Sequence, residues 1–292
     1  MTEWVTLEQG SGEWLAYRAN KFNASEAGAV MGVNPWLPKN PAQLYDIKTG
    51  AAQVKMNAAM QNGIDTEPAA RAYAERYLKD DLTPLVACKG RYSASLDGVN
   101  FDATLAVEIK CPQSTDSKLF DLVTPNTIRT LAPNYWWQIV HQFYVVNSLK
   151  QLAFVVYHPD KQNFVMINRD EVIGYFDQLC AAWEHFGEAL DSQKRPEEEE
   201  CDDSEEFGQL AHAYRVQKLK VEAAEAELAA INEEIKAYAK RSGKTQIKGF
   251  NVTVSLVTRQ GNVDYKKIPE LKGVDLDKYR GKPSTYYMVK TT

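Results

Sequence analysis

Apolar positions recur with two different periods along the first two thirds of the chain. Spacings of three and four residues predict helices over residues 25–31, 69–78, 136–146 and 172–190. Runs rich in β-branched residues, or alternating apolar and polar ones, predict strands over residues 91–95, 105–110 and 152–157. A helix follows most of these strands, so the order of elements indicates a mixed α/β fold.

The apolar residues from Leu210 to Tyr238 follow a heptad pattern. They fall on alternating a and d positions, and Gln217 is the one polar interruption. We expect one long helix that ends at Ser242–Gly243, then a strand or hairpin over residues 247–257 with a turn at Lys248–Gly249. Such heptads can pair within the chain, with a second copy or with another protein, so the pattern leaves the oligomeric state open.

Charge divides the chain further. The formal net charge is −5, but residues 196–206 hold eight acidic and no basic side chains, whereas residues 207–292 hold sixteen basic and nine acidic ones, a balance of +7. We therefore expect a main domain over residues 1–194, an acidic linker over residues 195–206, and a basic segment over residues 207–292 that contains the heptad helix and a small β element.

Two classes of protein are disfavoured by the remaining composition. No apolar run approaches the roughly 20 residues that span a bilayer, and the N-terminus lacks the features of a signal peptide, so we expect a cytoplasmic protein without a membrane segment. The four cysteines are scattered and form no C-x-x-C pair. We interpret them as reduced structural residues and not as a zinc or iron–sulfur site.

Candidate chemistry is concentrated between Ser95 and Pro112. Asp97 is expected on one strand and Glu108 on the next, and Lys110 shares the face of Glu108 because side chains alternate along a strand. Two carboxylates, with the carbonyl of Ile109, would suit Mg²⁺ or Mn²⁺, and a lysine could polarise an attacking water. The alternative is a hairpin turn at Asp97–Gly98 and a solvent-facing Glu108–Lys110 pair.

Other polar residues accompany this segment. Glu67 precedes a predicted helix, with Pro68 in its first turn, where a carboxylate can simply favour the helix dipole. Gln138 and Gln142 lie one turn apart on an otherwise apolar helix, where they either form hydrogen bonds within the core or contact the lysine or DNA. We interpret the neighbouring His141 as structural.

Arg18 and Ser25 lie near the N-terminus. Ser25 can be a helix cap and Arg18 an ordinary surface residue, but a helix N-terminus with a serine and a nearby guanidinium can also bind phosphate.

Taken in order, these segments resemble the phage lambda exonuclease and YqaJ-type viral recombinase family of PD-(D/E)xK nucleases. The resemblance covers roughly residues 11–160. It rests on W-x-x-x-R followed by A-S-E, G-x-x-x-E, S-x-D-G, E-I-K-C-P and the Q-x-x-x-Q helix that runs into the strand Phe154–Tyr157. It implies a restriction-endonuclease-like core, with a mixed central sheet flanked by helices. It also implies a Mg²⁺-dependent 5′→3′ exonuclease on duplex DNA that leaves a 3′ single strand, with Mn²⁺ able to substitute.

The resemblance also implies roles for individual residues. Glu67, Asp97, Glu108 and the Ile109 carbonyl would hold the metal, Lys110 would act on the water, and Gln138 would support it. Three more residues would bind the 5′-phosphate of the recessed strand, namely Arg18, Ser25 and Ser95. Implied partners are double-stranded DNA ends, a phage single-strand annealing protein and further copies of the chain, in the bacterial host cytoplasm if the protein is phage-encoded.

This sequence departs from the family in two places. Leu96 stands where proline usually precedes the aspartate, and the tail from Gly208 onward is absent from the shortest members. Two rival functions remain. One is a structure-specific or nicking endonuclease with the same core, and the other is a non-catalytic DNA-binding or assembly protein that uses the basic tail.

Overall fold

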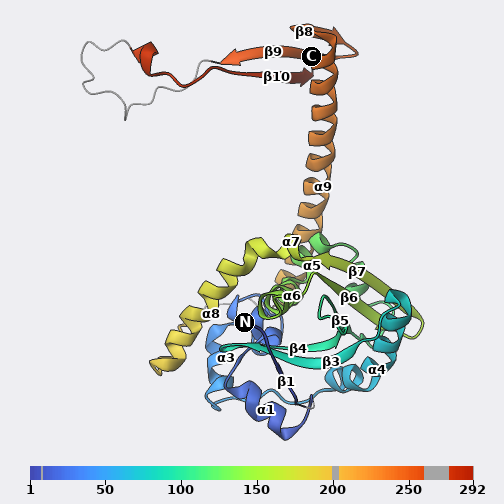
Figure 1. Ribbon diagram of the computed structural model, residues 1–292, viewed down its shortest axis with the longest axis vertical. Coiled ribbons are helices and arrows are strands. Elements are labelled where there is room, and N and C mark those ends of the chain that lie inside the picture. Colours follow the sequence, from blue (N-terminus) through green and yellow to red (C-terminus); the bar gives the residue numbers. More distant parts are fainter. Residues whose placement is uncertain (8, 199–203, 260–275, 292) are drawn as a thin grey trace. The chain divides into compact units, whose positions relative to one another are not determined.

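The computed structural model describes residues 1–7, 9–198, 204–259 and 276–291. Two units are distinguished, Met1–Val216 and Gln217–Thr292 (Figure 1). The centre of the expected acidic linker, residues 199–203, lies outside the described residues, and so does Cys201.

A seven-stranded mixed sheet organises the first unit. Its strands are β1 (Glu3–Val5), β2 (Phe22–Asn23), β3 (Thr83–Lys89), β4 (Tyr92–Val99), β5 (Leu105–Lys110), β6 (Gln151–His158) and β7 (Lys161–Asn168). Their order is β1-β3-β4-β5-β6-β7, and β2 pairs with β4 beside this path. Among the described strand pairs of this sheet, β5–β6 and β2–β4 are parallel and the others are antiparallel. The expected mixed sheet is confirmed.

Helices complete this unit. They are α1 (Gly12–Ala19), η1 (Ala24–Glu26), α2 (Ala27–Val30), α3 (Pro41–Lys48), α4 (Ala58–Leu78), η2 (Lys118–Asp121), α5 (Pro125–Leu131), α6 (Pro133–Val145), α7 (Arg169–Val172), η3 (Ile173–Tyr175) and α8 (Phe176–Asp191). Parallel strands need a crossover connection, and α6 supplies it between β5 and β6. Within the described residues, no helix is long and apolar enough to cross a membrane.

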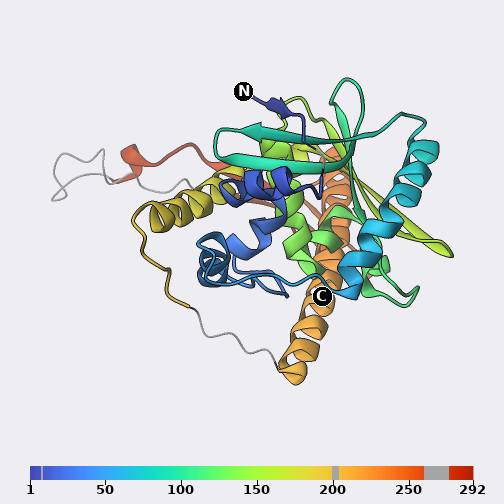
Figure 2. The same cartoon turned by 90° about the horizontal axis from the view of Figure 1, so that it is seen from below.

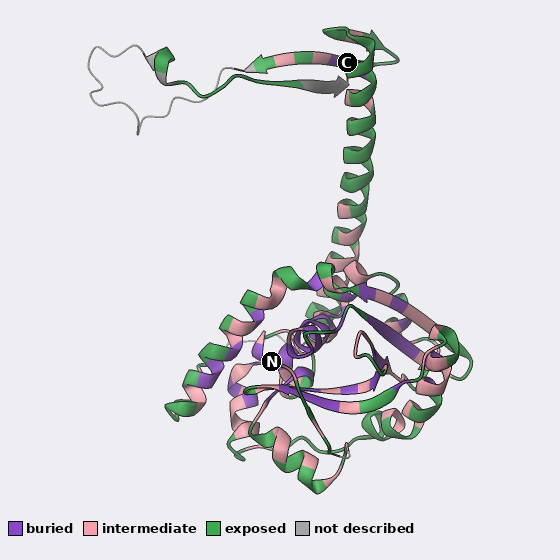
Figure 3. Cartoon of the chain, viewed as in Figure 1, coloured by how far each residue is buried: buried purple, intermediate pink, exposed green. Residues whose placement is uncertain are grey.

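The sheet carries a separate apolar core on each face. On one face the core includes Phe143 of α6, Phe154 of β6 and Trp183 of α8, and on the other α4 packs over Val107 and Val155. Figure 2 shows helices around the sheet, and Figure 3 shows buried residues along its strands. The central strand β5 is therefore covered on both sides. Its residues alternate between the two faces, which sends Glu108, the register partner of Phe154, toward α6.

The observed strands differ from the predicted ones in number and length. Residues 105–110 form β5 as predicted, but β4 continues to Val99, and β3 and β7 were not predicted. Helices follow β1, β2, β5 and β7, as expected for most strands, but β3 leads directly into β4, β4 into β5, and β6 into β7. Strand β7 lies at the sheet edge, and half-exposed edge strands show weak apolar patterning.

Helix α4 differs most from the prediction. It begins at Ala58, capped by the Asn57 side chain, so Glu67 and Pro68 lie in the middle of a helix of 21 residues. The prediction that Glu67 precedes the helix is therefore wrong. The first half of α4 is largely exposed and has no apolar periodicity to reveal it. Pro68 lacks the amide hydrogen that would bond to the carbonyl of Ile64, and its ring crowds that carbonyl.

Two other helical segments also differ from the prediction. The helix predicted over residues 172–190 is interrupted, because residues 173–175 form the 3₁₀ turn η3 between α7 and α8. Ser25 lies inside the 3₁₀ turn η1 and does not cap it; Asn23 and Glu26 form the capping box there. Ser25 is therefore not needed as a cap.

The long heptad helix is confirmed as α9 (Glu205–Ser242). It ends at Gly243, whose φ of +67° is the left-handed conformation that terminates many helices. In the second unit, β8 (Gln246–Gly249), β9 (Val252–Arg259) and β10 (Ser284–Thr291) form an antiparallel sheet of order β10-β9-β8, and a 3₁₀ turn, η5 (Leu276–Tyr279), precedes β10. The hairpin turn is at Phe250–Asn251, two residues beyond the predicted position.

His141 is structural, as its apolar setting suggested. It is fully buried, and Trp183 Nε1 donates a hydrogen bond to its Nδ1 over 3.1 Å, so the imidazole is neutral. Burial lowers the pKa of His141 from 6.5 to about 3, against the opposing effect of the backbone groups of Ser93 and Phe22. In the unfolded chain the imidazole keeps its ordinary pKa and takes up a proton first as the pH falls.

We therefore predict that the free energy of unfolding decreases as the pH falls from about 6.5 toward 3, with a contribution from His141 of about 1.4 kcal/mol per pH unit. His141→Asn keeps an acceptor for Trp183 but does not titrate in this range. Urea unfolding of both proteins between pH 7 and 4.5 measures the difference in slope, and equal slopes would contradict the assignment.

Gly98 allows β4 to approach its neighbours closely. A Cβ at this position would lie 2.9 Å from both Leu82 Cβ and Val107 Cγ2. We predict that Gly98→Ala lowers the free energy of unfolding by about 1–3 kcal/mol, as overpacking does. Gly63→Ala in α4 is the matched control, since its added methyl meets nothing within 4 Å, and it should stabilise the helix by about 0.5–1 kcal/mol. Chemical denaturation compares the two variants.

Candidate active site

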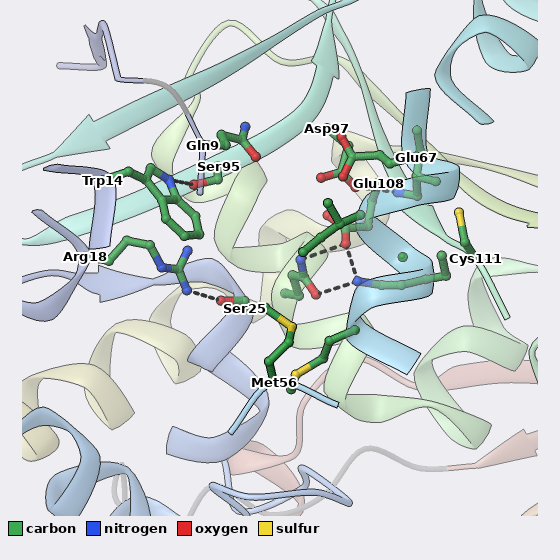
Figure 4. A pocket seen from close by; sticks show the side chains of 16 residues that line it. Gln9, Trp14, Arg18, Ser25, Met56, Glu67, Ser95, Asp97, Glu108 and Cys111 are labelled. Atoms are coloured by element: carbon green, nitrogen blue, oxygen red, sulfur yellow. Dashed lines mark hydrogen bonds and ion pairs between the residues drawn. The ribbon is translucent and has the colours of Figure 1, made fainter. Parts of the chain in front are cut away.

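A cavity of about 360 Å³ opens beside β4 and β5, between the N-terminal elements and α4. All the residues predicted for the site line it, and Figure 4 shows Arg18, Glu67 and Asp97 among those that converge from separate elements. They are Arg18, Ser25, Glu67, Ser95, Asp97, Glu108, Lys110 and Gln138, together with Ile109.

The floor of the cavity is formed where β4 and β5 separate. The two strands pair only through Gly98–Val107 and Val99–Ala106. Beyond that point Asp97 Oδ2 accepts a hydrogen bond from the Ile109 amide over 2.7 Å, so the carboxylate takes the place of a backbone partner. Asp97–Gly98 thus belongs to a strand, and the hairpin-turn alternative is wrong.

Glu108 is almost completely buried, with a relative exposure of 1%. Its Oε1 accepts from Gln138 Nε2 at 2.7 Å and lies 2.5 Å from Lys110 Nζ, and its Oε2 accepts from Gln142 Nε2 at 2.5 Å. Lys110 Nζ also donates to Gln138 Oε1 over 3.3 Å. The alternative of a solvent-facing pair is therefore wrong. Gln138 contacts both the carboxylate and the lysine, and Gln142 contacts the carboxylate.

The charges in this cavity perturb one another. Burial alone would lower the pKa of Lys110, but the negative charge of Glu108, with smaller effects of Tyr135 and Asp97, raises it above its usual value. Lys110 is therefore an ammonium at neutral pH. Burial raises the pKa of Asp97 well above its ordinary value, and the nearby charges of Glu108 and then Glu67 raise it further. The site concentrates negative charge that Lys110 offsets only in part.

Glu67 reaches the site from α4 and is held there by Arg71, one turn further along the helix. The Arg71 guanidinium pairs with the Glu67 carboxylate, and its Nε donates to the Asp97 carbonyl over 2.5 Å. Arg71 was not singled out from the sequence. Its spacing of four residues from Glu67 was the available signal, but such pairs are common on helices.

The opposite end of the cavity holds Arg18, Ser25 and Ser95, which Trp14 connects. Arg18 Nη2 donates to Ser25 Oγ over 2.7 Å, and its guanidinium lies 4.4 Å from the centre of the Trp14 ring. Trp14 Nε1 in turn donates to Ser95 Oγ over 3.0 Å. Figure 4 shows the two hydrogen bonds side by side. This arrangement gathers one cation and two hydroxyls, a set of donors suited to a phosphate group.

Among the described residues, no group of three or more His, Cys, Asp or Glu side chains is arranged to hold a metal ion. The reason is that donors of the protein itself already bind the carboxylate oxygens. Gln138, Gln142 and Lys110 bind Glu108, the Ile109 amide binds Asp97, and Arg71 binds Glu67. The chemistry of the donors nevertheless fits a hard divalent cation. Three carboxylates line one cavity, and burial, together with the negative charges of Glu108 and Glu67, raises the pKa of Asp97, a shift that a bound cation would oppose.

The cysteines in the described part of the chain are free thiols, namely Cys88, Cys111 and Cys180. Cys111 lines the cavity, and burial, with the charges of Asp97 and Glu67, raises its pKa to about 12. It therefore stays protonated at neutral pH. Leu96 is fully buried in the larger core. Its apolar side chain has an ordinary packing role there.

Comparison with known proteins identifies the fold and the motif-bearing region. Residues 13–149 match the YqaJ-like viral recombinase domain. No curated protein matches the chain. The crystal structure of LHK-Exo in complex with dAMP is 26% identical and covers 63% of this chain and 97% of that chain, with a TM-score of 0.50.

Other similar structures also bear the name exonuclease. The alkaline exonuclease LHK-Exo from Laribacter hongkongensis is 27% identical, with coverages of 63% and 97% and a TM-score of 0.48. A phage related exonuclease from Haemophilus somnus 129PT is 13% identical, with coverages of 59% and 96% and a TM-score of 0.46. The family match, the LHK-Exo complex with dAMP and the mixed sheet lead to one conclusion: residues 13–149 are similar to the YqaJ-like viral recombinase domain, and the mixed central sheet flanked by helices is similar to the fold of PD-(D/E)xK exonucleases such as LHK-Exo.

Proposed function

We propose that this protein is a metal-dependent 5′→3′ exonuclease that digests one strand of double-stranded DNA from its end and leaves a 3′ single strand for recombination. One observation carries the proposal: the same cavity holds a carboxylate–lysine group at one end and a cation–hydroxyl group at the other. The first suits hydrolysis of a phosphodiester, and the second suits capture of the terminal phosphate.

In this proposal Glu67, Asp97 and Glu108 hold Mg²⁺, with the carbonyl of Ile109 as a further ligand, and Mn²⁺ can substitute. The bound cation would lower the pKa of a water molecule and neutralise charge on the scissile phosphate. Binding requires the carboxylates to exchange their present hydrogen-bond donors for the ion. Arg71 keeps Glu67 close to the Asp97 backbone, which limits the rearrangement required.

Lys110 and Gln138 act on the reacting groups. The Lys110 ammonium projects from the same face of β5 as Glu108, and we assign it the role of holding the attacking water and stabilising charge on the phosphate. Gln138 receives a hydrogen bond from Lys110 and donates one to Glu108, so it fixes the orientation of both side chains. The relative LHK-Exo has been crystallised with dAMP, a deoxynucleoside monophosphate of the kind that an exonuclease releases.

Arg18, Ser25 and Ser95 would bind the 5′-phosphate of the recessed strand. Capture of an end distinguishes an exonuclease from the rival reading, a structure-specific or nicking endonuclease with the same carboxylates. The proposed partner at this site is therefore the end of duplex DNA. The resemblance to the exonuclease family adds two further proposed partners, a single-strand annealing protein that receives the 3′ strand and further copies of this chain.

The test is time-resolved digestion of linear duplex DNA with 5′-phosphate or 5′-hydroxyl ends, beside closed circular DNA. With Mg²⁺ we expect mononucleotides to be released from the 5′-phosphorylated strand. EDTA or Lys110→Ala should abolish release, a loss of at least about 100-fold. Cleavage of the circle would favour the endonuclease. DNA binding with no cleavage at all would favour the non-catalytic binding protein.

A second prediction concerns Arg71. Because it joins Glu67 to the backbone of Asp97, Arg71→Met should lower cleavage about 10- to 100-fold and shift the Mg²⁺ titration to higher concentration. Arg76→Met is the matched control, since Arg76 is exposed on the same helix and does not line the cavity. Initial rates measured across a Mg²⁺ series test this, and equal titration midpoints for the two variants would refute the role of Arg71.

A further inference from the structure

Lys48, at the end of α3, has its ammonium group buried behind the cavity. Its side chain is only 4% exposed, and it is not among the residues that line the cavity. Nζ donates to the carbonyl of Arg18 over 3.0 Å and to the carbonyl of Lys21 over 2.7 Å, and it pairs with Glu26 Oε2 at 2.7 Å. The three hydrogens of the ammonium thus have three acceptors, a complete set for a buried charge.

Asn23 repeats the same contacts from another direction. Its Nδ2 donates to the carbonyls of Arg18 and Lys21, over 2.9 and 3.2 Å, and to Glu26 Oε2 over 2.9 Å. Two carbonyls and one carboxylate therefore lie between an ammonium and an amide, and Lys48 and Asn23 are both buried. Removing one partner of such a network leaves the other polar groups unpaired.

The network joins the two backbone segments that carry the proposed phosphate ligands. Arg18 lies in the last turn of α1, and Lys48 binds its carbonyl. Ser25 lies next to Glu26 in η1, and Lys48 pairs with that carboxylate. The Arg18–Ser25 hydrogen bond of 2.7 Å therefore spans two elements whose separation is held from behind by one cation.

Burial of Lys48 also has an electrostatic cost that a simple helix cap does not require. Burial lowers its pKa, and the charge of Glu26 opposes that shift. An exposed lysine near the end of α1 would satisfy the last carbonyls of the helix without desolvation. The Lys48 ammonium instead contacts both segments at once, and in some proteins buried polar groups select one arrangement of the chain.

We propose that Lys48 is a positioning residue that gives the site its preference for 5′-phosphorylated ends, by fixing Arg18 relative to Ser25. This inference rests on the proposed function, since it assumes that these two side chains bind the phosphate. It assigns Lys48 no contact with DNA.

The test compares Lys48→Met with the parent protein on duplexes that differ only in a 5′-phosphate or 5′-hydroxyl. We expect the ratio of kcat/KM for the two ends to fall by about 10- to 100-fold, because a small misplacement of a binding group has effects of that size. The rate on 5′-hydroxyl ends should stay close to that of the parent protein. Binding of both duplexes in EDTA, followed by fluorescence anisotropy, should show the same loss of preference without cleavage.

Two further variants separate positioning from general damage. The double variant Glu26→Gln/Lys48→Met removes both charges, so no unpaired carboxylate is left. This double variant should still lack the preference for 5′-phosphorylated ends.

Arg169→Met is the matched control. Arg169 Nη1 donates to the carbonyls of Phe143, Val146 and Leu149 at the end of α6, and Arg169 does not line the cavity. Its loss should affect thermal stability but not the ratio.

The outcomes are distinguishable from failure of the proposed function. If the parent protein prefers phosphorylated ends and both Lys48 variants keep that preference, Lys48 has no positioning role and the inference is wrong. If the parent cleaves both kinds of end equally, the phosphate pocket and the inference are both wrong, although the nuclease proposal stands. If the parent cleaves no DNA, loss of phosphate preference in the anisotropy measurement alone still supports the role of Lys48, and its retention overturns it.

Discussion

The separation of β4 from β5 at Asp97 is the feature on which the site depends. Two neighbouring strands that part in a sheet interior leave backbone amides without partners, and such groups are costly when buried. Asp97 removes that cost by accepting the hydrogen bond of the Ile109 amide. The same carboxylate thereby becomes fixed at the floor of the cavity, and Gly98 lets the strands meet closely just before they part.

Burial of Glu108 determines what surrounds it. A carboxylate with 1% exposure needs charged or hydrogen-bonding partners, and the crossover helix α6 supplies two amides while β5 supplies Lys110. This explains why a helix rich in aromatic residues carries Gln138 and Gln142 one turn apart. The topology places these amides, because the parallel pair β5–β6 needs a crossover connection and helix α6 in that connection packs over the face of β5 that carries Glu108.

Polar partners also hold the side chains at the other end of the cavity. Trp14 stacks on Arg18 and binds Ser95, and Lys48 lies behind Arg18 in a buried network. Cationic donors for a phosphate are useful only if they hold their geometry without the ligand. Here the rigidity comes from packed polar groups on α1, η1 and α3. Both ends of the cavity are therefore fixed from outside it, by Arg71 at one and by Lys48 at the other.

Local pattern in the sequence was sufficient for β5, the heptad helix and the placing of Glu108 beside Lys110 on one face, because these depend on periodicities of a few residues. The ordered motifs were sufficient to predict the similarity to the YqaJ-like viral recombinase domain over residues 13–149. The exposed first half of α4, strands β3 and β7, Arg71 and Lys48 became apparent only in the tertiary structure. Their roles depend on contacts between residues far apart in the chain, such as Lys48 with Arg18, and the pairing of distant polar groups leaves no periodic trace in the sequence.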